Sequence, residues 1–175
     1  HPEERACVAR AVPKRQHEFA TGRRLAHQLL ARLGAPDFAL LSDADRAPIW
    51  PEGLIGSISH YHGLCVVAVS PRGAPSGLGV DVEEACGVRP ELWRRVMRPE
   101  EEEWLRAQPG AQQLHLAAVF FSAKEAVYKA LQVLPGARTV GWREIGVRRL
   151  PDGRPEAVLT GRAAAEFAGP GIMIS

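Results

Sequence analysis

The sequence FSAKEAVYKA, residues 121–130, combines good helix formers with three charged side chains, Lys124, Glu125 and Lys129. It belongs to a longer segment, roughly 112–133, that we expect to be a helix, because apolar residues recur at helical spacing. Glu125 and Lys129 are four residues apart, which suits an ordinary surface ion pair. Physics alone favours that structural interpretation over an active site. The predicted apolar stripe comprises Leu116, Phe120, Ala123, Val127, Leu131 and Leu134.

The composition is that of an ordinary globular protein. The chain has 175 residues, of which 46% are hydrophobic and 24% charged, so we expect one domain or two small lobes. A net charge of +2 is too small to indicate nucleic-acid binding. Three cysteines at irregular spacing fit neither a zinc site nor a disulfide framework, and no apolar run is long enough to span a bilayer. We therefore predict a cytoplasmic protein, and we expect residues to be missing at both ends.

Residues 15–33 are predicted to form a helix with an apolar stripe of Phe19, Ala26, Leu30 and Leu33. Arg15 and Arg23 lie four residues either side of Phe19 and project on the same face. A charge on an apolar stripe is costly unless it extends outwards to water or finds a partner. The two arginines therefore either reach the solvent or bind an anion at the edge of the core.

The rest of the chain alternates between strand and helix patterns. Residues 57–70 are rich in β-branched side chains around Gly63, and residues 77–84 are predicted to be a short strand. Residues 98–107 suggest a helix whose acidic run is structural. Residues 141–150 and 155–161 look like a β-hairpin around the turn PDGRP, and the final GIMIS resembles a strand. Short hairpins between helices indicate an α+β fold.

Two segments bear candidate chemistry. On a strand over 77–84, the carboxylates of Asp81 and Glu83 project to one face, where a divalent cation would relieve their repulsion. Glu125 adds a third carboxylate if the long helix lies beside that strand. In GSISHYHG, residues 56–63, Ser59 and His60 follow a glycine-rich turn and suit a phosphate, whereas a Ser–His nucleophile lacks its usual glycine-flanked motif.

Four motifs in this order resemble the 4′-phosphopantetheinyl transferases of the larger type, which includes the enterobactin- and surfactin-pathway enzymes. They are EFATGR (18–23), WPEGLIGSISH (50–60), GLGVDVEE (77–84) and FSAKEAVYKA (121–130). The composition rich in Arg, Ala and Gly resembles that of an actinobacterial member. The resemblance implies a pseudo-twofold α+β fold with lobes 1–76 and 77–175, each with a small antiparallel sheet and a long helix, and coenzyme A in the cleft between them.

The resemblance also implies an activity and the residues that perform it. The enzyme would transfer 4′-phosphopantetheine from coenzyme A to a serine of an apo carrier protein, with Mg²⁺ or Mn²⁺, and release adenosine 3′,5′-bisphosphate. Asp81, Glu83 and Glu125 match the metal ligands, and Glu125, Lys124 and Asp81 the catalytic residues. Coenzyme A would be bound by Arg15, Arg23, Arg46, Ser59, His60, Lys124 and Lys129. Arg46 is the basic residue nearest Ser42, where some relatives carry a lysine.

The expected partners are acyl or peptidyl carrier domains of fatty-acid, polyketide, nonribosomal-peptide or siderophore synthesis. Residues 89–98, RPELWRRVMR, would help to bind such an acidic carrier, and a monomer would suffice. Two alternatives stay open. One is a metal-dependent phosphohydrolase or nuclease, since such enzymes also pair carboxylates with a lysine. The other is a non-catalytic module that binds coenzyme A or a carrier protein.

Overall fold

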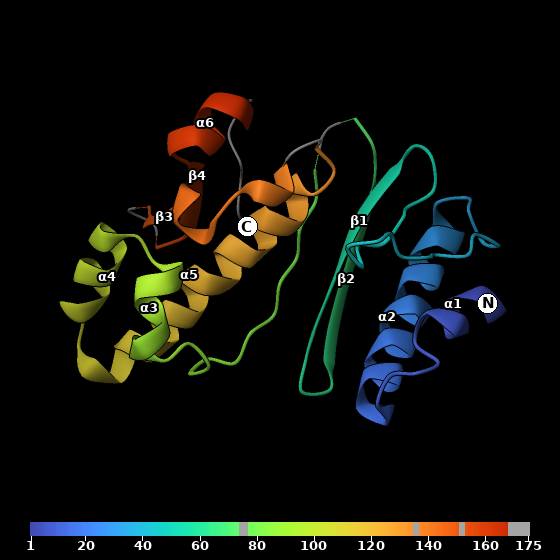
Figure 1. The fold of residues 1–175 in the computed structure, drawn as a ribbon, viewed down its shortest axis with the longest axis horizontal. Helices are drawn as coiled ribbons and strands as arrows, with labels where there is room; N and C mark the ends of the chain where they lie inside the picture. The colour runs from blue at the N-terminus through green and yellow to red at the C-terminus, as the bar shows by residue number, and fades with distance from the viewer. Residues whose placement is uncertain (74–76, 135–136, 151–152, 168–175) are drawn as a thin grey trace. The chain divides into compact units, whose positions relative to one another are not determined.

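The computed structural model describes residues 1–73, 77–134, 137–150 and 153–167, which form two compact units (Figure 1). Unit 1 comprises His1–Val82 and unit 2 comprises Glu83–Ser175, so this division lies six residues after the expected boundary at residue 76. Each unit contains a two-stranded antiparallel sheet and one long helix. The α+β fold class predicted from the sequence is confirmed.

Unit 1 begins with α1 (Pro2–Cys7) and the long helix α2 (Pro13–Arg32). The prediction of a helix over 15–33 is confirmed, and Ala26 and Leu30 of its stripe are fully buried. Leu33 was wrongly assigned to that stripe. It is exposed, because the helix ends at Arg32 and Gly34 then takes a left-handed backbone conformation with φ of 88°.

The sheet of unit 1 is a β-hairpin of β1 (Leu54–Tyr61) and β2 (Leu64–Pro71). The β-branched residues of 57–70 indicated strand structure, and the structure shows that the strands on either side of Gly63 pair with each other. His62 and Gly63 form the two-residue turn of this hairpin, with φ of 41° and 86°. Two positive φ values in succession match the right-handed twist of a hairpin. The helix α2 packs against this sheet, and the hairpin presents the serines and the histidine of GSISHYHG along β1.

Residues 77–84 do not form the predicted strand. The backbone N–H groups of Val80 and Val82 donate instead to the hydroxyls of Ser57 and Ser59 on β1, at 3.1 and 3.3 Å. Side-chain oxygens have replaced the carbonyls of a sheet ladder, so the segment follows β1 without joining its sheet. The serines of β1 are therefore the reason that the strand prediction was wrong.

Unit 2 is built around one long helix, α5, which contacts α3, α4, β3 and β4 (Figure 1). Its predicted bounds, 112–133, lie two residues from those observed. Leu116, Phe120, Ala123, Val127 and Leu131 are buried as predicted, whereas Leu134 follows the end of the helix and is exposed. The elements are α3 (Pro90–Val96), α4 (Pro99–Arg106), α5 (Gly110–Leu131), η1 (Ala137–Thr139), η2 (Trp142–Glu144), β3 (Ile145–Arg149), β4 (Pro155–Leu159) and α6 (Gly161–Phe167).

The helix predicted over 98–107 and the hairpin predicted over 141–161 are confirmed as α4 and as the antiparallel pair β3–β4. Within the hairpin segment, residues 142–144 form a short 3₁₀-helix before β3 starts. Residues 151–152 of the predicted turn and the whole of GIMIS lie outside the described residues. Among the helices that are described, none is long and apolar enough to cross a membrane.

Candidate functional site

In unit 1, the two arginines of α2 that flank Phe19, Arg15 and Arg23, have different surroundings. Arg23 is only 7% exposed, and its Nη2 donates to Ser42 Oγ at 3.0 Å. Its guanidinium also lies over the Phe19 ring, 4.3 Å from the ring centre. Burial lowers the pKa of Arg23 from its ordinary value, and the Glu4 carboxylate opposes that shift. For Arg23, extension to solvent is thus the wrong interpretation, because the guanidinium is enclosed by protein.

Arg15 is more exposed and lies beside His60 at the end of β1. Arg15 Nη1 is 3.1 Å from His60 Nε2, and Glu18 Oε2 lies 3.0 Å from the same ring nitrogen. One ring nitrogen cannot accept from the arginine and donate to the carboxylate at once. The donor or acceptor role of His60 Nε2, and so the neighbour that it binds, depends on the tautomer of the ring.

A cavity of about 860 Å³ lies along α1 and α2, and Arg23 is among the residues that line it. Its wall is further defined by Glu4, which is buried on α1 and accepts from the Leu40 backbone N–H at 2.7 Å. His27 Nε2 is 2.8 Å from the same carboxylate oxygen, Oε1. These contacts join α1 to α2 and to the loop that contains Leu40, and they hold α2 in place.

The structure gives Ser59 a role in the position of Asp81. The Ser59 hydroxyl is buried and donates to Asp81 Oδ1 at 2.8 Å, while it accepts from the Val82 backbone N–H. Because this hydroxyl both donates and accepts a hydrogen bond inside unit 1, Ser59 fixes the direction of the Asp81 carboxylate. Its predicted contact with coenzyme A stays a prediction.

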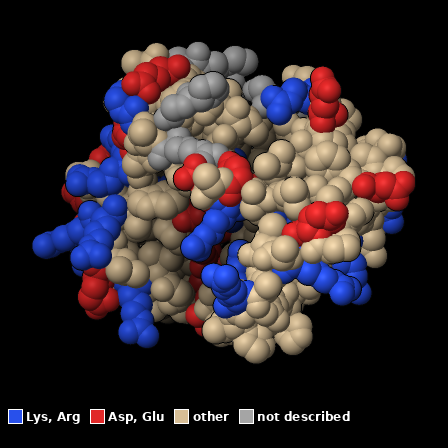
Figure 2. Space-filling model, turned by 45° about the vertical axis from the view of Figure 1, so that its right-hand side comes forward, with Lys and Arg blue, Asp and Glu red and all other residues tan. Residues whose placement is uncertain are grey.

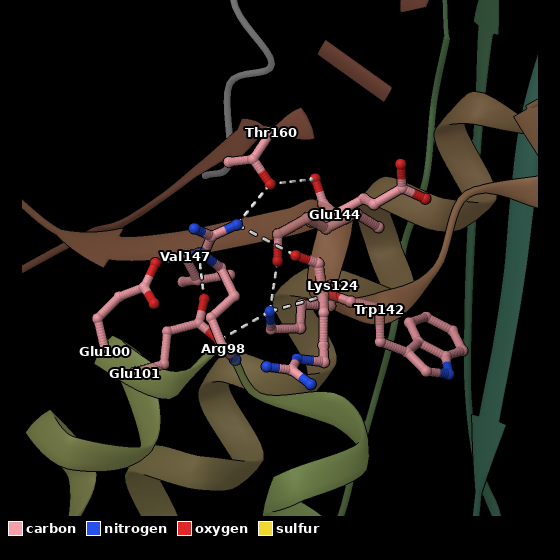
Figure 3. A network of polar contacts seen from close by, with 10 residues as sticks. Arg98, Glu100, Glu101, Lys124, Trp142, Glu144, Val147 and Thr160 are labelled. Atoms are coloured by element: carbon pink, nitrogen blue, oxygen red, sulfur yellow. Dashed lines mark hydrogen bonds and ion pairs between the residues drawn. The ribbon is translucent and has the colours of Figure 1, made fainter. Parts of the chain in front are cut away.

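In unit 2, helix α5 presents Glu125 and Lys129 at partly buried positions, whereas Lys124 is fully enclosed, with 0% exposure. Lys124 Nζ lies 2.8 Å from Glu101 Oε2 and donates to the backbone carbonyls of Trp142, at 3.1 Å, and Ile145 (Figure 3). Burial lowers the pKa of Lys124, and the Glu101 carboxylate works against that shift. The phosphate contact predicted for Lys124 stays untested, but its ammonium already has three protein partners.

Glu101 is the residue of this network that the sequence analysis did not single out. Its acidic run was interpreted only as structural, yet Glu101 is 4% exposed among acids that face solvent more fully. A signal was available. Met97, Glu101 and Leu105 recur every four residues, so Glu101 is a charge on an apolar stripe, the same pattern that identified Arg23.

Arg46 lies in a tight turn that follows Ser42. The turn is closed by Asp43, whose Oδ1 accepts from the backbone N–H groups of Asp45 and Ala47, both at 2.9 Å. Arg46 itself is exposed and has a left-handed backbone with φ of 68°. Its side chain is accessible to a ligand, and its predicted phosphate contact stays a prediction.

The predicted metal ligands are divided between the units, with Asp81 in unit 1 and Glu83 and Glu125 in unit 2. Within either unit, the described residues contain no group of three His, Cys, Asp or Glu side chains that could hold a metal ion. Three carboxylates nevertheless form an all-oxygen donor set, which is the kind that Mg²⁺ and Mn²⁺ bind. The residue types fit the ion, and the site itself stays a prediction.

Comparison with known proteins accounts for most of the chain. Residues 3–70 match the model of the 4′-phosphopantetheinyl transferase N-terminal domain, and residues 77–168 match that of the 4′-phosphopantetheinyl transferase superfamily. The chain belongs to this superfamily. The second match includes Asp81, Glu83 and Glu125, so all three predicted metal ligands lie within the superfamily region.

Curated members of the superfamily from actinobacteria are similar to this chain. The transferase Svp of Streptomyces mobaraensis is 43% identical over 136 residues, which cover 77% of this chain and 55% of Svp. Npt of Nocardia iowensis is 38% identical, over 82% of this chain and 64% of Npt. PptT of Mycobacterium tuberculosis is 36% identical, over 74% and 56%. The chain thus spans between about half and two thirds of these relatives.

Proposed function

We propose that this protein transfers the 4′-phosphopantetheine group from coenzyme A to a serine of an apo acyl or peptidyl carrier protein. The serine oxygen forms a bond to the phosphorus that bears the pantetheine arm. The pyrophosphate bond of coenzyme A breaks, and adenosine 3′,5′-bisphosphate leaves. The observation that supports this most strongly is the superfamily match over 77–168, which holds both acidic motifs in the expected order.

The proposed metal ligands are Asp81, Glu83 and Glu125, and the ion is Mg²⁺ or Mn²⁺. When bound, such an ion would neutralise negative charge on the pyrophosphate of coenzyme A. Ser59 supports this assignment, because a hydroxyl that donates to one oxygen of Asp81 orients the carboxylate without removing its charge.

Coenzyme A brings a pyrophosphate and a 3′-phosphate, and we assign the cations of both units to it. Arg15, Arg23 and His60 are the proposed phosphate ligands of unit 1, with Arg46 on the exposed turn. Lys129 is the proposed ligand of unit 2. Phosphoryl transfer depends chiefly on positioning and on stabilisation of charge, so a set of fixed guanidinium and ammonium groups suits this chemistry.

The carrier serine must lose a proton as its oxygen attacks, and we assign Glu125 as the acceptor. A carboxylate within reach of the serine hydroxyl is a common proton acceptor in enzymes. Glu125 lies partly buried on the rigid helix α5, which limits its motion. The same residue is a proposed metal ligand, so its position determines both parts of the reaction.

The proposed macromolecular partner is an acidic carrier domain, which would bind at α3. Leu92, Arg94 and Arg95 are all exposed there, while Trp93 between them is fully buried and anchors the helix. Exposed Lys and Arg side chains are visible on the surface in Figure 2. A mixed basic and apolar surface suits a partner that is acidic around its serine. We further propose that the protein acts in the cytoplasm as a monomer.

The decisive experiment is incubation of the protein with an apo carrier protein, coenzyme A and Mg²⁺, followed by intact-mass spectrometry of the carrier. We expect one added phosphopantetheinyl group, and none when EDTA is present. If no acyl or peptidyl carrier protein of any type gains mass, the proposal is refuted. Cleavage of coenzyme A or a nucleotide without carrier modification would instead favour a phosphohydrolase, whereas binding of coenzyme A alone would favour a non-catalytic module.

A further inference from the structure

Lys124 is the best-enclosed charged side chain of unit 2 among the described residues, and its three partners come from different parts of the fold. Glu101 belongs to the first turn of α4, Trp142 to η2 and Ile145 to the start of β3 (Figure 3). A lysine ammonium has three N–H donors, so these contacts use its full capacity. Lys124 therefore has no donor left for a ligand in this arrangement.

The Glu101 carboxylate is equally engaged. Its Oε1 accepts from the Val147 backbone N–H at 2.6 Å. Its Oε2 accepts from the Arg98 backbone N–H at 2.7 Å and pairs with Lys124. One buried carboxylate thus joins the beginning of α4, the middle of β3 and the centre of α5. Arg98 extends the network through its guanidinium, which donates to the Arg143 carbonyl and to Thr160 (Figure 3).

We infer that the Glu101–Lys124 pair is a positioning device that fixes the rotation of α5 and thereby aims Glu125 and Lys129. This inference rests on the proposed function, because it assigns Lys124 a role that acts through its neighbours instead of through contact with a phosphate. Successive residues of a helix lie about 100° apart, so a fixed Lys124 fixes the direction of Glu125. Lys129, four residues after Glu125, then projects about 40° from it.

The apolar face of α5 supplies a second argument. Its buried apolar residues are Leu116, Ala117, Ala118, Phe120, Ala123, Val127 and Leu131. The hydrophobic contacts that such side chains make are not directional. A buried ion pair adds little stability compared with apolar side chains of the same size, but its hydrogen bonds are directional. The three bonds of Lys124 therefore define the height and the rotation of α5 more narrowly than the non-directional apolar contacts do.

The test compares Lys124→Met, Glu101→Gln and the double variant by kinetics and by calorimetric titration with coenzyme A. We expect each single variant to lower kcat by about tenfold or more, because misplacement of a reacting group by about 1 Å has effects of this size. KM and Kd for coenzyme A should rise less than they do in Lys129→Met, because these variants misdirect the Lys129 ammonium but do not remove it. The double variant should be no worse than the more impaired single one, since both changes break the same contact.

Two further variants serve as references. Glu102, the residue after Glu101 on α4, forms a surface ion pair with Arg106. Glu102→Gln removes this pair and should leave kcat and KM unchanged. Lys129→Met removes a proposed phosphate ligand and should raise KM and Kd for coenzyme A. If Lys124→Met fails to fold, the double variant carries the comparison, because it leaves no unpaired charge in the core.

The outcomes separate this inference from the proposed function. If the wild-type protein binds coenzyme A but modifies no carrier, the proposed function is refuted. A different result is possible when the wild-type protein does modify the carrier. Lys124→Met could raise KM and Kd for coenzyme A about tenfold at normal kcat, while Glu101→Gln changes neither KM nor Kd. In that case Lys124 contacts coenzyme A directly. That result would overturn the positioning role alone.

Discussion

At the level of single residues, the distinctive feature of this protein is a small set of charged side chains in buried positions. Glu4 and Arg23 are buried in unit 1, and Glu101 and Lys124 in unit 2. A buried charge is tolerated only with close partners. Glu4 lies beside His27, Arg23 beside Ser42, and Glu101 beside Lys124. Each of these contacts joins parts of the chain that are distant in sequence.

Glu125→Gln tests the proposed proton acceptor. The amide keeps the shape of the side chain but cannot take a proton, so we expect kcat/KM for carrier modification to fall by about a hundredfold or more. The measurement is kcat/KM against pH with saturating coenzyme A. Glu103→Gln, at an exposed position of α4, should behave as the wild type. Near-normal turnover in Glu125→Gln would eliminate this role.

Glu144 predicts a pH dependence of stability. Its carboxylate accepts hydrogen bonds from the backbone N–H groups of Gly141, at 3.0 Å, and Ala163, and it pairs with Arg162. These contacts, chiefly the one with Gly141, hold the pKa of Glu144 below its ordinary value of 4.5. As the pH falls, the Glu144 carboxylate binds a proton in the unfolded chain before it does so in the folded protein. The stabilisation is therefore fully present above about pH 4.5, and it is lost as the pH falls through the lower pKa of the folded state.

The measurement is the free energy of unfolding in urea from pH 3 to pH 7. Glu144→Gln cannot titrate, so its stability should fall less steeply with acid than that of the wild type. The exposed Glu103→Gln again provides the control. Equal slopes for Glu144→Gln and the wild type would show that this corner of η2 and α6 contributes nothing to acid sensitivity.

At the level of secondary-structure elements, β1 is the element that organises unit 1. Its serines alternate along one face, and they hold the backbone of residues 80–82 by side-chain hydrogen bonds. Near the end of the same strand, His60 lies beside Arg15 of α2. A single hairpin thus aligns a proposed metal ligand, Asp81, with proposed phosphate ligands.

Ser59→Ala tests this arrangement. It removes the donor to Asp81 and the acceptor of the Val82 N–H in a buried setting, so we expect a loss of about 1–3 kcal/mol in the free energy of unfolding. Half-maximal activity should also require more Mg²⁺, because the carboxylate is less well oriented. Ser70→Ala on β2 is the control, since the Ser70 hydroxyl makes only an exposed contact with the Pro71 carbonyl. Equal behaviour of the two variants would contradict the prediction.

For the molecule as a whole, charge is distributed unevenly although the net charge is only +2. The basic residues divide into enclosed ones, such as Arg23 and Lys124, and exposed ones on α3. Enclosed cations suit a small polyanion or an internal carboxylate, whereas exposed cations act on the approach of a macromolecule. We therefore expect small-molecule binding and carrier recognition to respond to different substitutions.

Charge reversal of Arg94 and Arg95 tests this separation. The double variant Arg94→Glu with Arg95→Glu should raise KM for the carrier protein by about tenfold and leave KM for coenzyme A unchanged. The wild-type KM for the carrier should itself rise with salt. Arg72→Glu, on the exposed loop after β2, is the control for net charge and should change neither constant. Equal effects of the double variant on both substrates would refute carrier binding at α3.

The sequence by itself determined the main elements, because helical and strand periodicities are local properties of the chain. It was sufficient for α2, α4, α5 and the hairpin β3–β4, and its four motifs were sufficient to place the chain in its superfamily. The apolar stripes also identified the buried residues Ala26, Leu30, Leu116, Phe120, Ala123, Val127 and Leu131, and they were wrong at Leu33 and Leu134, where the helix had already ended.

Only the tertiary structure decided which charged side chains are enclosed and what they contact. Lys124 and Lys129 both belong to one motif, yet Lys124 is buried against Glu101. Residues 77–84 had the pattern of a strand, but the hydroxyls of Ser57 and Ser59 took their backbone donors. Such contacts join distant positions, such as Glu101 and Val147, which are 46 residues apart. Burial depends on the surface that packs against a residue, and local sequence periodicity does not specify that surface.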